Sequence, residues 1–474
     1  MSAIVTLAVG RVPNFLAQHY WNNEVANATR DPEATTITHQ LFSNVNKELV
    51  PRSVSVDYVE NRGPLPMEES NLTGLVRSQS ADVIRNTEPL SDYHLFRNGL
   101  REPEARKRYA QAGAKAYAAW EQAGYKGIDE ISDVRIEYQR LGRYGNDYME
   151  PNTRGMECWT PFWRGQTTQL REQTEEQLRR QLEAIDRLDA LQLFVSGEEG
   201  WNGFLSCLLD DVVAEIAKRP LLTHQPIDTL ELFQATSTPS SGAFVDNAEL
   251  LYDLSQLGSD FITLPYNSTI TSIKEENGSN PYISMALPAL AASSFSLNAR
   301  RNAYSIAGVV QGLLPIPDMS IVISRLATAL PNDTEKLLDL TGMTPEQHKP
   351  LALVRSFYVN QKTFDLKSLE NPLSYPTGVA RSLVLQGSLI HLGETFPHIF
   401  PERYGLRYRV MTPATAEYRN SPDALSYLER LETALSLNRS QTDRTEEIHN
   451  YVATIAETYR GGARHHSRDS SDSE

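Results

Sequence analysis

The sequence contains little cysteine and no long apolar run. Its 474 residues include two cysteines, Cys158 and Cys207, and no Cys-x-x-Cys pair. A disulfide framework and a cysteine-built zinc cluster are therefore excluded as organising devices, and the low cysteine content suits a reducing compartment. No stretch reaches the roughly 18–20 apolar residues that a spanning helix needs. The sequence therefore predicts no membrane-spanning segment.

Positive charge is also scarce. The chain has 45 Lys and Arg against 60 Asp and Glu, a formal net charge of −15, which argues against nucleic-acid binding through phosphate contacts. Apolar residues make up 40% and charged residues 22%, values typical of globular proteins, so collagen, a coiled-coil rod and a wholly disordered chain are excluded. A chain of this length is too large for one compact core, and we expect two or three domains.

The first 23 residues contain no carboxylate and one arginine, Arg11. Such a composition occurs in mitochondrial transit peptides, but a cleavable leader should be an Arg-rich amphipathic helix. Residues 4–9 instead form a short apolar run, rich in β-branched side chains, that stops at Gly10. This pattern favours a buried strand, and we expect a strand at this place.

Strands and helices alternate through the first half of the chain, which predicts a parallel sheet. The glycine-containing loop 196–203 separates a strand from a helix, and α/β proteins place ligands in such loops. The expected strands are residues 4–9, 53–57 and 191–195; the expected helices are 15–21, 100–125, 171–191 and 205–212. The helix at 171–191 is predicted from apolar residues at steps of three and four: Leu178, Leu182, Ile185, Leu188 and Leu191.

The second half contains one long segment without charge. Residues 282–299 predict a helix that is apolar all round and therefore buried, with Pro288 at its start or at a kink. A short helix is expected over 246–254 and a strand over 383–385.

The C-terminal region is predicted to be helical. Ser421-Pro422-Asp423 has the composition of a helix start, with proline at the first helical position. The last helix is expected over 445–459 and should stop at Gly461-Gly462. Residues 463–474 are expected to be disordered.

Neither a Walker A motif nor a Gly-x-Gly-x-x-Gly run is present, yet several segments stand in the order found in tubulins. The resemblance covers the first phosphate loop with its helix, the strand leading to the second nucleotide loop, the helix whose asparagine touches guanine, and the core helix. These segments are Ile4-Val5 with Gly10, Asn14 and Trp21; Val50-Pro51-Arg52 with Val54, Val56 and Asp57; Phe244–Asn247 with Tyr252-Asp253; and residues 282–299.

Within that superfamily the sequence most resembles the Misato-type proteins, a tubulin-like family linked to mitochondrial inheritance. The resemblance implies an α/β fold with a Rossmann-like parallel-sheet N-terminal domain, a buried core helix, a smaller α/β second domain and C-terminal helices. The residues concerned are Asn14-Phe15, His19–Asn23, Ala190–Gln192, Gly200–Phe204, Leu251–Ser255 and Leu264-Pro265. The implied divisions are 1–280, 281–300, 301–420, 421–462 and the tail 463–474.

The resemblance also indicates which residues would hold GTP, if nucleotide is retained. Each has a plainer interpretation: Gly10 and Asn14 as turn and packing residues, Asp57 as a cap after its strand, and Asn247 as an ordinary helix residue. No catalytic residue and no metal ligand is assigned. The cofactor-binding candidates are Gly10, Arg11, Asn14, Asp57, Gly200, Gly203 and Asn247.

Three features argue against a working GTPase. The glycine string of tubulins is replaced by Glu198-Glu199-Gly200-Trp201, and a carboxylate near a phosphate opposes it by about 4 kcal/mol at 4 Å and an effective dielectric of 20. Pro13 has no N–H to offer a phosphate. Between Asn277 and Pro317 there is no Asp or Glu, so the segment after the core helix supplies no hydrolytic base.

We therefore expect a non-catalytic protein without a cofactor that acts in mitochondrial organisation, partitioning and DNA inheritance. It would be cytoplasmic and mitochondrion-associated, with protein partners at mitochondria and a cytosolic chaperonin as folding partner. Nucleic acid is not expected as a partner. One alternative is a GTP-binding, filament-forming tubulin relative with GTPase activity. Another is an unrelated α/β enzyme, for which the sequence shows no acid or nucleophile cluster.

Overall fold

The computed structural model describes part of the chain, and all statements below concern that part. The described residues are 2–30, 38–45, 48–58, 132–136, 169–196, 201–216, 219–227, 242–257, 261–267, 285–302, 304–313, 321–330, 333–340, 352–358, 381–387, 389–392, 411–413, 416–420, 424–437 and 443–471. The predicted helix at 100–125 and the predicted helix start at 421–423 lie outside them.

An eleven-stranded sheet forms the middle of the molecule, with its strands in the order β12-β11-β15-β9-β8-β7-β6-β1-β4-β5 and β10 paired to β9. Every pair from β5 to β9 is parallel. The strands of this parallel part are β1 (Ser2–Val9), β4 (Ser53–Tyr58), β5 (Ser132–Ile136), β6 (Arg187–Val195), β7 (Leu221–Ile227), β8 (Phe261–Asn267) and β9 (Ile321–Leu330).

Beyond β9 the sheet becomes mixed. Strand β15 (Ala416–Asn420) lies between β9 and β11 (Ala352–Tyr358) and is antiparallel to both, whereas β11 and β12 (Arg381–Gly387) are parallel. The sheet thus continues across the predicted boundary after residue 280, and the domain divisions stay a prediction. The remaining strands are β10 (Asp333–Asp339) and two hairpins, β2 (Phe42–Val45) with β3 (Glu48–Pro51) and β13 (Leu389–His391) with β14 (Met411–Pro413).

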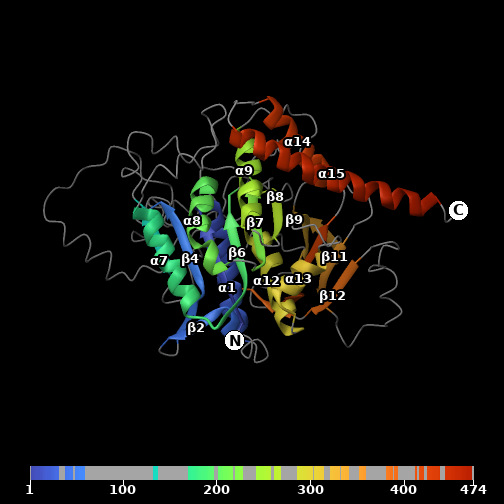
Figure 1. Ribbon diagram of the computed structural model, residues 1–474. Helices are drawn as coiled ribbons and strands as arrows, with labels where there is room; N and C mark the ends of the chain where they lie inside the picture. The colour runs from blue at the N-terminus through green and yellow to red at the C-terminus, as the bar shows by residue number, and fades with distance from the viewer. Residues whose placement is uncertain are drawn as a thin grey trace, which may run out of the picture.

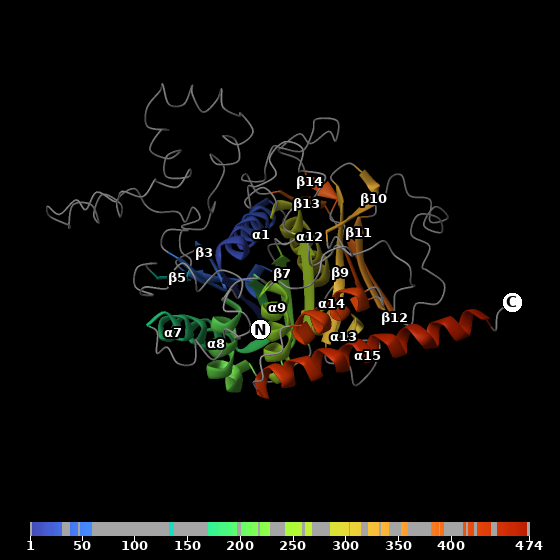
Figure 2. The same ribbon diagram turned by 90° about the horizontal axis from the view of Figure 1, so that it is seen from above.

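Helices cover both faces of the sheet (Figures 1 and 2). Helices α1 (Arg11–Arg30) and α12 (Ala286–Arg301) pack together on one face, and helices α7, α8 and α9 lie on the other. The remaining bounds are η1 (Thr38–Gln40), α7 (Gln169–Glu183), α8 (Trp201–Ile216), α9 (Gly242–Gln256), α13 (Ile306–Leu313), α14 (Ala424–Leu437) and α15 (Asp443–Ser471).

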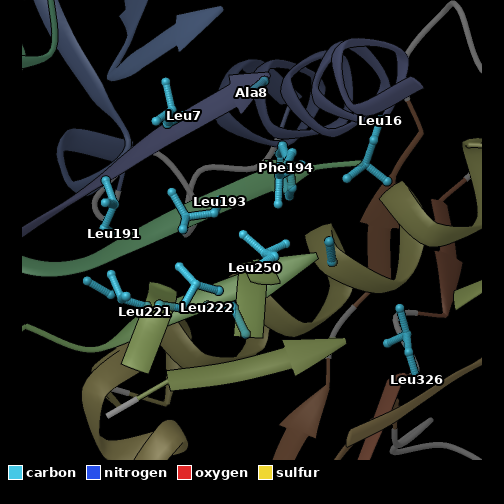
Figure 3. Close-up of a cluster of buried hydrophobic side chains, with 14 of the residues drawn as sticks. Leu7, Ala8, Leu16, Leu191, Leu193, Phe194, Leu221, Leu222, Leu250 and Leu326 are labelled. Atoms are coloured by element: carbon cyan, nitrogen blue, oxygen red, sulfur yellow. The ribbon is translucent and has the colours of Figure 1, made fainter. Parts of the chain in front are cut away.

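The core lies between these layers. Figure 3 shows side chains from β6 and β7 near Leu250 of α9, while Leu326 of β9 lies further away in the same buried cluster. Helix α12 is buried from Ala286 through Arg300, as its lack of charge predicted, and Pro288 lies in its first turn, where a missing N–H costs nothing. The fold is therefore mixed α/β with a parallel sheet and a buried helix, as predicted.

Three predicted element boundaries are wrong. Helix α7 ends at Glu183, and Leu188 and Leu191 lie in β6, because the helical spacing of the apolar residues continues by chance into a buried strand. Helix α8 begins at Trp201, inside the predicted loop. Helix α15 continues through Gly461-Gly462 to Ser471, so the stop at 461 and the disorder predicted for 463–471 are contradicted. Glycine costs a helix about 1 kcal/mol per residue and does not by itself end it.

Candidate functional site

The candidate site is the carboxyl edge of the parallel strands. Strands β1, β4 and β6 are neighbours, so their ends at Val9, Tyr58 and Val195 lie along one edge of the sheet. Helix α1 begins directly after β1, and helix α8 begins a few residues after β6. The N-terminal turns of two helices therefore face the same edge, an arrangement that attracts anions in α/β proteins.

A network of hydrogen bonds around Gly10 and Asn14 builds the turn after β1. Gly10 has a φ of 93°, a conformation that side chains disfavour, and its N–H donates to the Val56 carbonyl at 2.9 Å. The Asn14 side-chain amide donates to the carbonyls of Gly10 at 2.7 Å and Val56 at 2.9 Å. Its oxygen accepts a hydrogen bond from the Ser55 hydroxyl. Asn14 thus joins the turn to the end of β4.

These bonds limit what the turn offers to a phosphate. The Gly10 N–H is used by Val56, and Asn14 N–H donates to Gly10 O at 3.1 Å as the first helical hydrogen bond. Of the helix-start positions between them, Pro13 has no N–H, which leaves the amides of Arg11 and Val12. The Arg11 side chain, which was predicted to contact a phosphate, is not among the side chains that the structure describes. Of the backbone N–H groups from Gly10 to Asn14, the turn therefore leaves those of Arg11 and Val12 for an anion.

The start of α8 is buried rather than open. Trp201 is 1% exposed and packs edge-on against Phe204, with ring centroids 5.6 Å apart. The Asn202 side chain, also buried, donates to the Asp246 carbonyl of α9 at 3.2 Å. The candidate Gly203 lies in the same buried turn. Gly200 and the two glutamates before it lie outside the described ranges.

Asn247 and Asp57, the other two candidates, are fully buried. The Tyr427 hydroxyl of α14 lies 3.4 Å from the Asn247 side-chain oxygen, so a C-terminal helix covers the asparagine assigned to guanine. Asp57 lies at the end of β4 beside the turn. The structure therefore brings Gly10, Asn14 and Asp57 together, and places Gly203 and Asn247 at the α8–α9 contact.

Sequence reasoning missed three residues that shape this edge: Ser55, Asn202 and Tyr427. Ser55 and Asn202 are polar residues in otherwise apolar segments of the sequence. Such a position only weakly indicates that the side chain is buried and hydrogen-bonded. Tyr427 lies 180 residues from Asn247 along the chain, and no local pattern connects them.

A buried ion pair ties the site helix α1 to the core helix α12. Arg300 binds Glu24 through a salt bridge whose side chains are 3% and 2% exposed. One turn earlier, the Tyr20 hydroxyl donates to Ser296 Oγ at 3.1 Å. Burial raises the pKa of the Glu24 carboxyl despite the opposing charge of Arg300, and it also raises the pKa of Tyr20. The two helices are thus held side by side through polar groups that water does not reach.

Two further properties of the described residues bear on function. Within these ranges, no three His, Cys, Asp or Glu side chains are placed to hold a metal ion together. Across the same part of the chain, no helix has the length and apolar character needed to cross a bilayer.

The parallel sheet, the buried helix beside α1 and the strand–turn–helix edge define a mixed α/β protein, an architecture consistent with a tubulin-like fold. Residues 2–111 match the family model described as Misato Segment II tubulin-like domain. The match supports a Misato-type tubulin-like protein, and it includes Asn14-Phe15 and His19–Asn23, which carried the resemblance in the first part of the chain. A search of curated proteins finds no significant match.

Proposed function

We propose that this protein is a tubulin-like scaffold that does not turn over nucleotide. The observation that carries the proposal is the Asn14 network: both amide hydrogens and the oxygen of Asn14 bond to Gly10, Val56 and Ser55. Because both side-chain N–H groups of Asn14 are used within the protein and its oxygen already accepts a bond, we assign this side chain to fixing the turn. The burial of Trp201 and Asn247 at the neighbouring helices supports the same conclusion.

The sequence around the edge supports the absence of hydrolysis. Glu198 and Glu199 stand where tubulins have glycines, and each carboxylate near a phosphate would oppose it by about 4 kcal/mol at 4 Å in a medium of effective dielectric 20. Residues 277–317 comprise the core helix and the segments on either side of it. They contain no Asp or Glu, so the segment after the core helix supplies no general base.

We further propose that the scaffold acts through protein contacts in mitochondrial organisation, partitioning and DNA inheritance, from the cytoplasm and at mitochondria. Support for this comes from the resemblance to Misato-type proteins and from the family match over residues 2–111.

A cytosolic chaperonin is proposed as folding partner because of the sheet order. Strand β15 fills the gap between β9 and β11, so the sheet is completed only by residues 416–420. Pairing between distant segments is slow and leaves strand edges exposed in the meantime.

The alternative, a GTP-binding and filament-forming protein, is favoured by one observation: the N-terminal turns of α1 and α8 share one edge. The two functions are separated by incubating the purified protein with GTP and Mg²⁺ while following phosphate release and light scattering. The proposal expects neither to rise above buffer. Phosphate release with filament growth, both lost in Asn247→Ala, would establish the alternative.

The mitochondrial part requires a cellular test. Depleting the protein should produce unequal mitochondrial partitioning and loss of mitochondrial DNA, and re-expression of the intact chain should restore both. The Asn14→Ala variant, in which the turn after β1 should be loosened, is expected to restore mitochondrial partitioning and mitochondrial DNA less well than the wild type at the same protein level. Normal mitochondrial inheritance after depletion would refute this part.

A further inference from the structure

Helix α15 extends beyond the body of the protein. Its first part packs on α14 and α9, and the last of its side chains that the structure describes as buried is Tyr459. The backbone then continues as a helix to Ser471. In Figures 1 and 2 this last part of α15 extends past β11 and β12 and out from the body. At 1.5 Å per residue, residues 461–471 form a helical extension about 16 Å long.

The extension 461–471 is a weak helix. It begins with Gly461 and Gly462, and glycine is among the poorest helix formers. Helices shorter than roughly 12–15 residues are marginal in water unless packing supports them. Ser471 is the last helical residue, and the ends of helices fray. This end of α15 can therefore open and present its serine hydroxyl to another protein.

The sequence around the end of α15 has a charge pattern that a second protein can read. Ser471 is followed directly by Asp472 and, at the third position, by Glu474. No other serine in the sequence has a carboxylate at both of these positions. Ser467, by contrast, is followed by Arg468 and has no carboxylate at the third position. Because acidic motifs are recognised by clusters of basic side chains, the pattern at Ser471 fits a protein kinase with a basic substrate groove.

We propose that Ser471 is a phosphorylation site for an acid-directed serine kinase, and that its phosphate unwinds the extension 461–471. The kinase transfers the γ-phosphoryl group of ATP to the Ser471 hydroxyl oxygen, the hydroxyl proton passes to the catalytic base of the kinase, and ADP leaves. The new group carries about −1.5 to −2 charges at pH 7. It lies at the negative end of the helix dipole, where an anion destabilises the helix. Phosphorylation thus converts the extension from a helix to an extended chain, without involving the carboxyl edge of the sheet.

The test uses the full-length protein, ATP with Mg²⁺ and a purified serine kinase that selects carboxylates after its target residue. Mass spectrometry locates the phosphate. Ser471→Ala removes the acceptor, and Asp472→Asn/Glu474→Gln removes the two charges that the kinase reads. Arg468→Gln is the matched control, because it removes a charge three residues before Ser471 instead of three residues after it. Amide hydrogen exchange at sub-second labelling times then compares residues 461–471 before and after phosphorylation, with β6 as the internal reference.

Phosphate is expected on Ser471 in the wild type and on no residue of the tail in Ser471→Ala. The initial rate should fall about tenfold or more in Asp472→Asn/Glu474→Gln and stay within about twofold of wild type in Arg468→Gln. Exchange of residues 461–471 should become about threefold faster or more after phosphorylation, with β6 unchanged. Phosphate on another serine or on none, a rate that depends on Arg468 and not on the carboxylates, or unchanged exchange after phosphorylation would overturn the proposal.

Discussion

Replacing Arg300 with methionine perturbs the ion pair that joins α1 to α12. In the wild type, Arg300 binds Glu24 and donates from Nε to the Ser296 carbonyl at 3.2 Å, and both charged side chains are at most 3% exposed. Without the guanidinium, the Glu24 carboxylate stays buried with no counter-charge in this pair. Breaking a buried pair in this way costs about 3–5 kcal/mol, a large part of the 5–15 kcal/mol that typically stabilises a folded protein.

The same reasoning gives a sign for the dependence on pH. Burial raises the pKa of the Glu24 carboxyl, and losing Arg300 should raise it further. A carboxyl whose folded pKa lies above its unfolded value loses its stabilising contribution as pH rises through the folded pKa. The deficit of Arg300→Met should therefore be largest at neutral pH and shrink as the solution is acidified.

Urea unfolding followed by tryptophan fluorescence measures this effect in a double-mutant cycle. Glu24→Gln/Arg300→Met removes both charges, and since neutral replacement of a buried pair is often tolerated, it should recover about 2 kcal/mol or more. Arg179→Met is the control, because Arg179 lies on the surface of α7 with Glu176 and should change stability little. Two results would refute the reasoning. One is a loss of unfolding free energy in Arg300→Met as small as that in Arg179→Met. The other is a double variant whose loss equals the sum of the losses in Glu24→Gln and Arg300→Met.

Three further predictions concern the edge and the sheet. Gly10→Ala should lose about 1–2 kcal/mol of unfolding free energy, because φ is 93° there; an unchanged urea midpoint would contradict it. Asn14→Ala should lose about 1–3 kcal/mol, because the Gly10 and Val56 carbonyls each lose one of two donors and the buried Ser55 hydroxyl loses its bond to Asn14; the loss should be smaller when added to Gly10→Ala, since both loosen one turn. Burial lowers the pKa of His224 to about 3, so acidification below its ordinary pKa favours the unfolded state, which takes up the proton. His224→Gln should therefore lose less stability between neutral and acidic pH than wild type, and equal losses would show that His224 does not titrate in this way.

The parts of the fold that the sequence predicted are those with a local cause. Residues 4–9 form β1 because a β-branched apolar run ends at a glycine, and the charge-free segment 282–299 forms most of the buried helix α12. The strands at 53–57 and 383–385 were predicted on similar grounds and are found within β4 and β12. Short-range periodicity was sufficient in each case.

The parts that the sequence did not predict depend on distant contacts. The apolar spacing through Leu188 and Leu191 is compatible with a helix, and only pairing with β1 makes this segment a strand. Nothing near residue 416 indicates that β15 inserts between β9 and β11. At the site, Gly10 and Asn14 were identified through the resemblance to tubulins, whereas the partners that fix their roles, Ser55 and Val56, come from another strand.

The central claim is that the carboxyl edge serves as a structural element and not as a nucleotide-turnover site. The most direct measurement is the guanine nucleotide released when freshly purified protein is denatured, quantified against protein concentration, together with phosphate release before denaturation. The account predicts far less than one nucleotide per chain and no phosphate release. Stoichiometric GTP or GDP with steady phosphate release would contradict it.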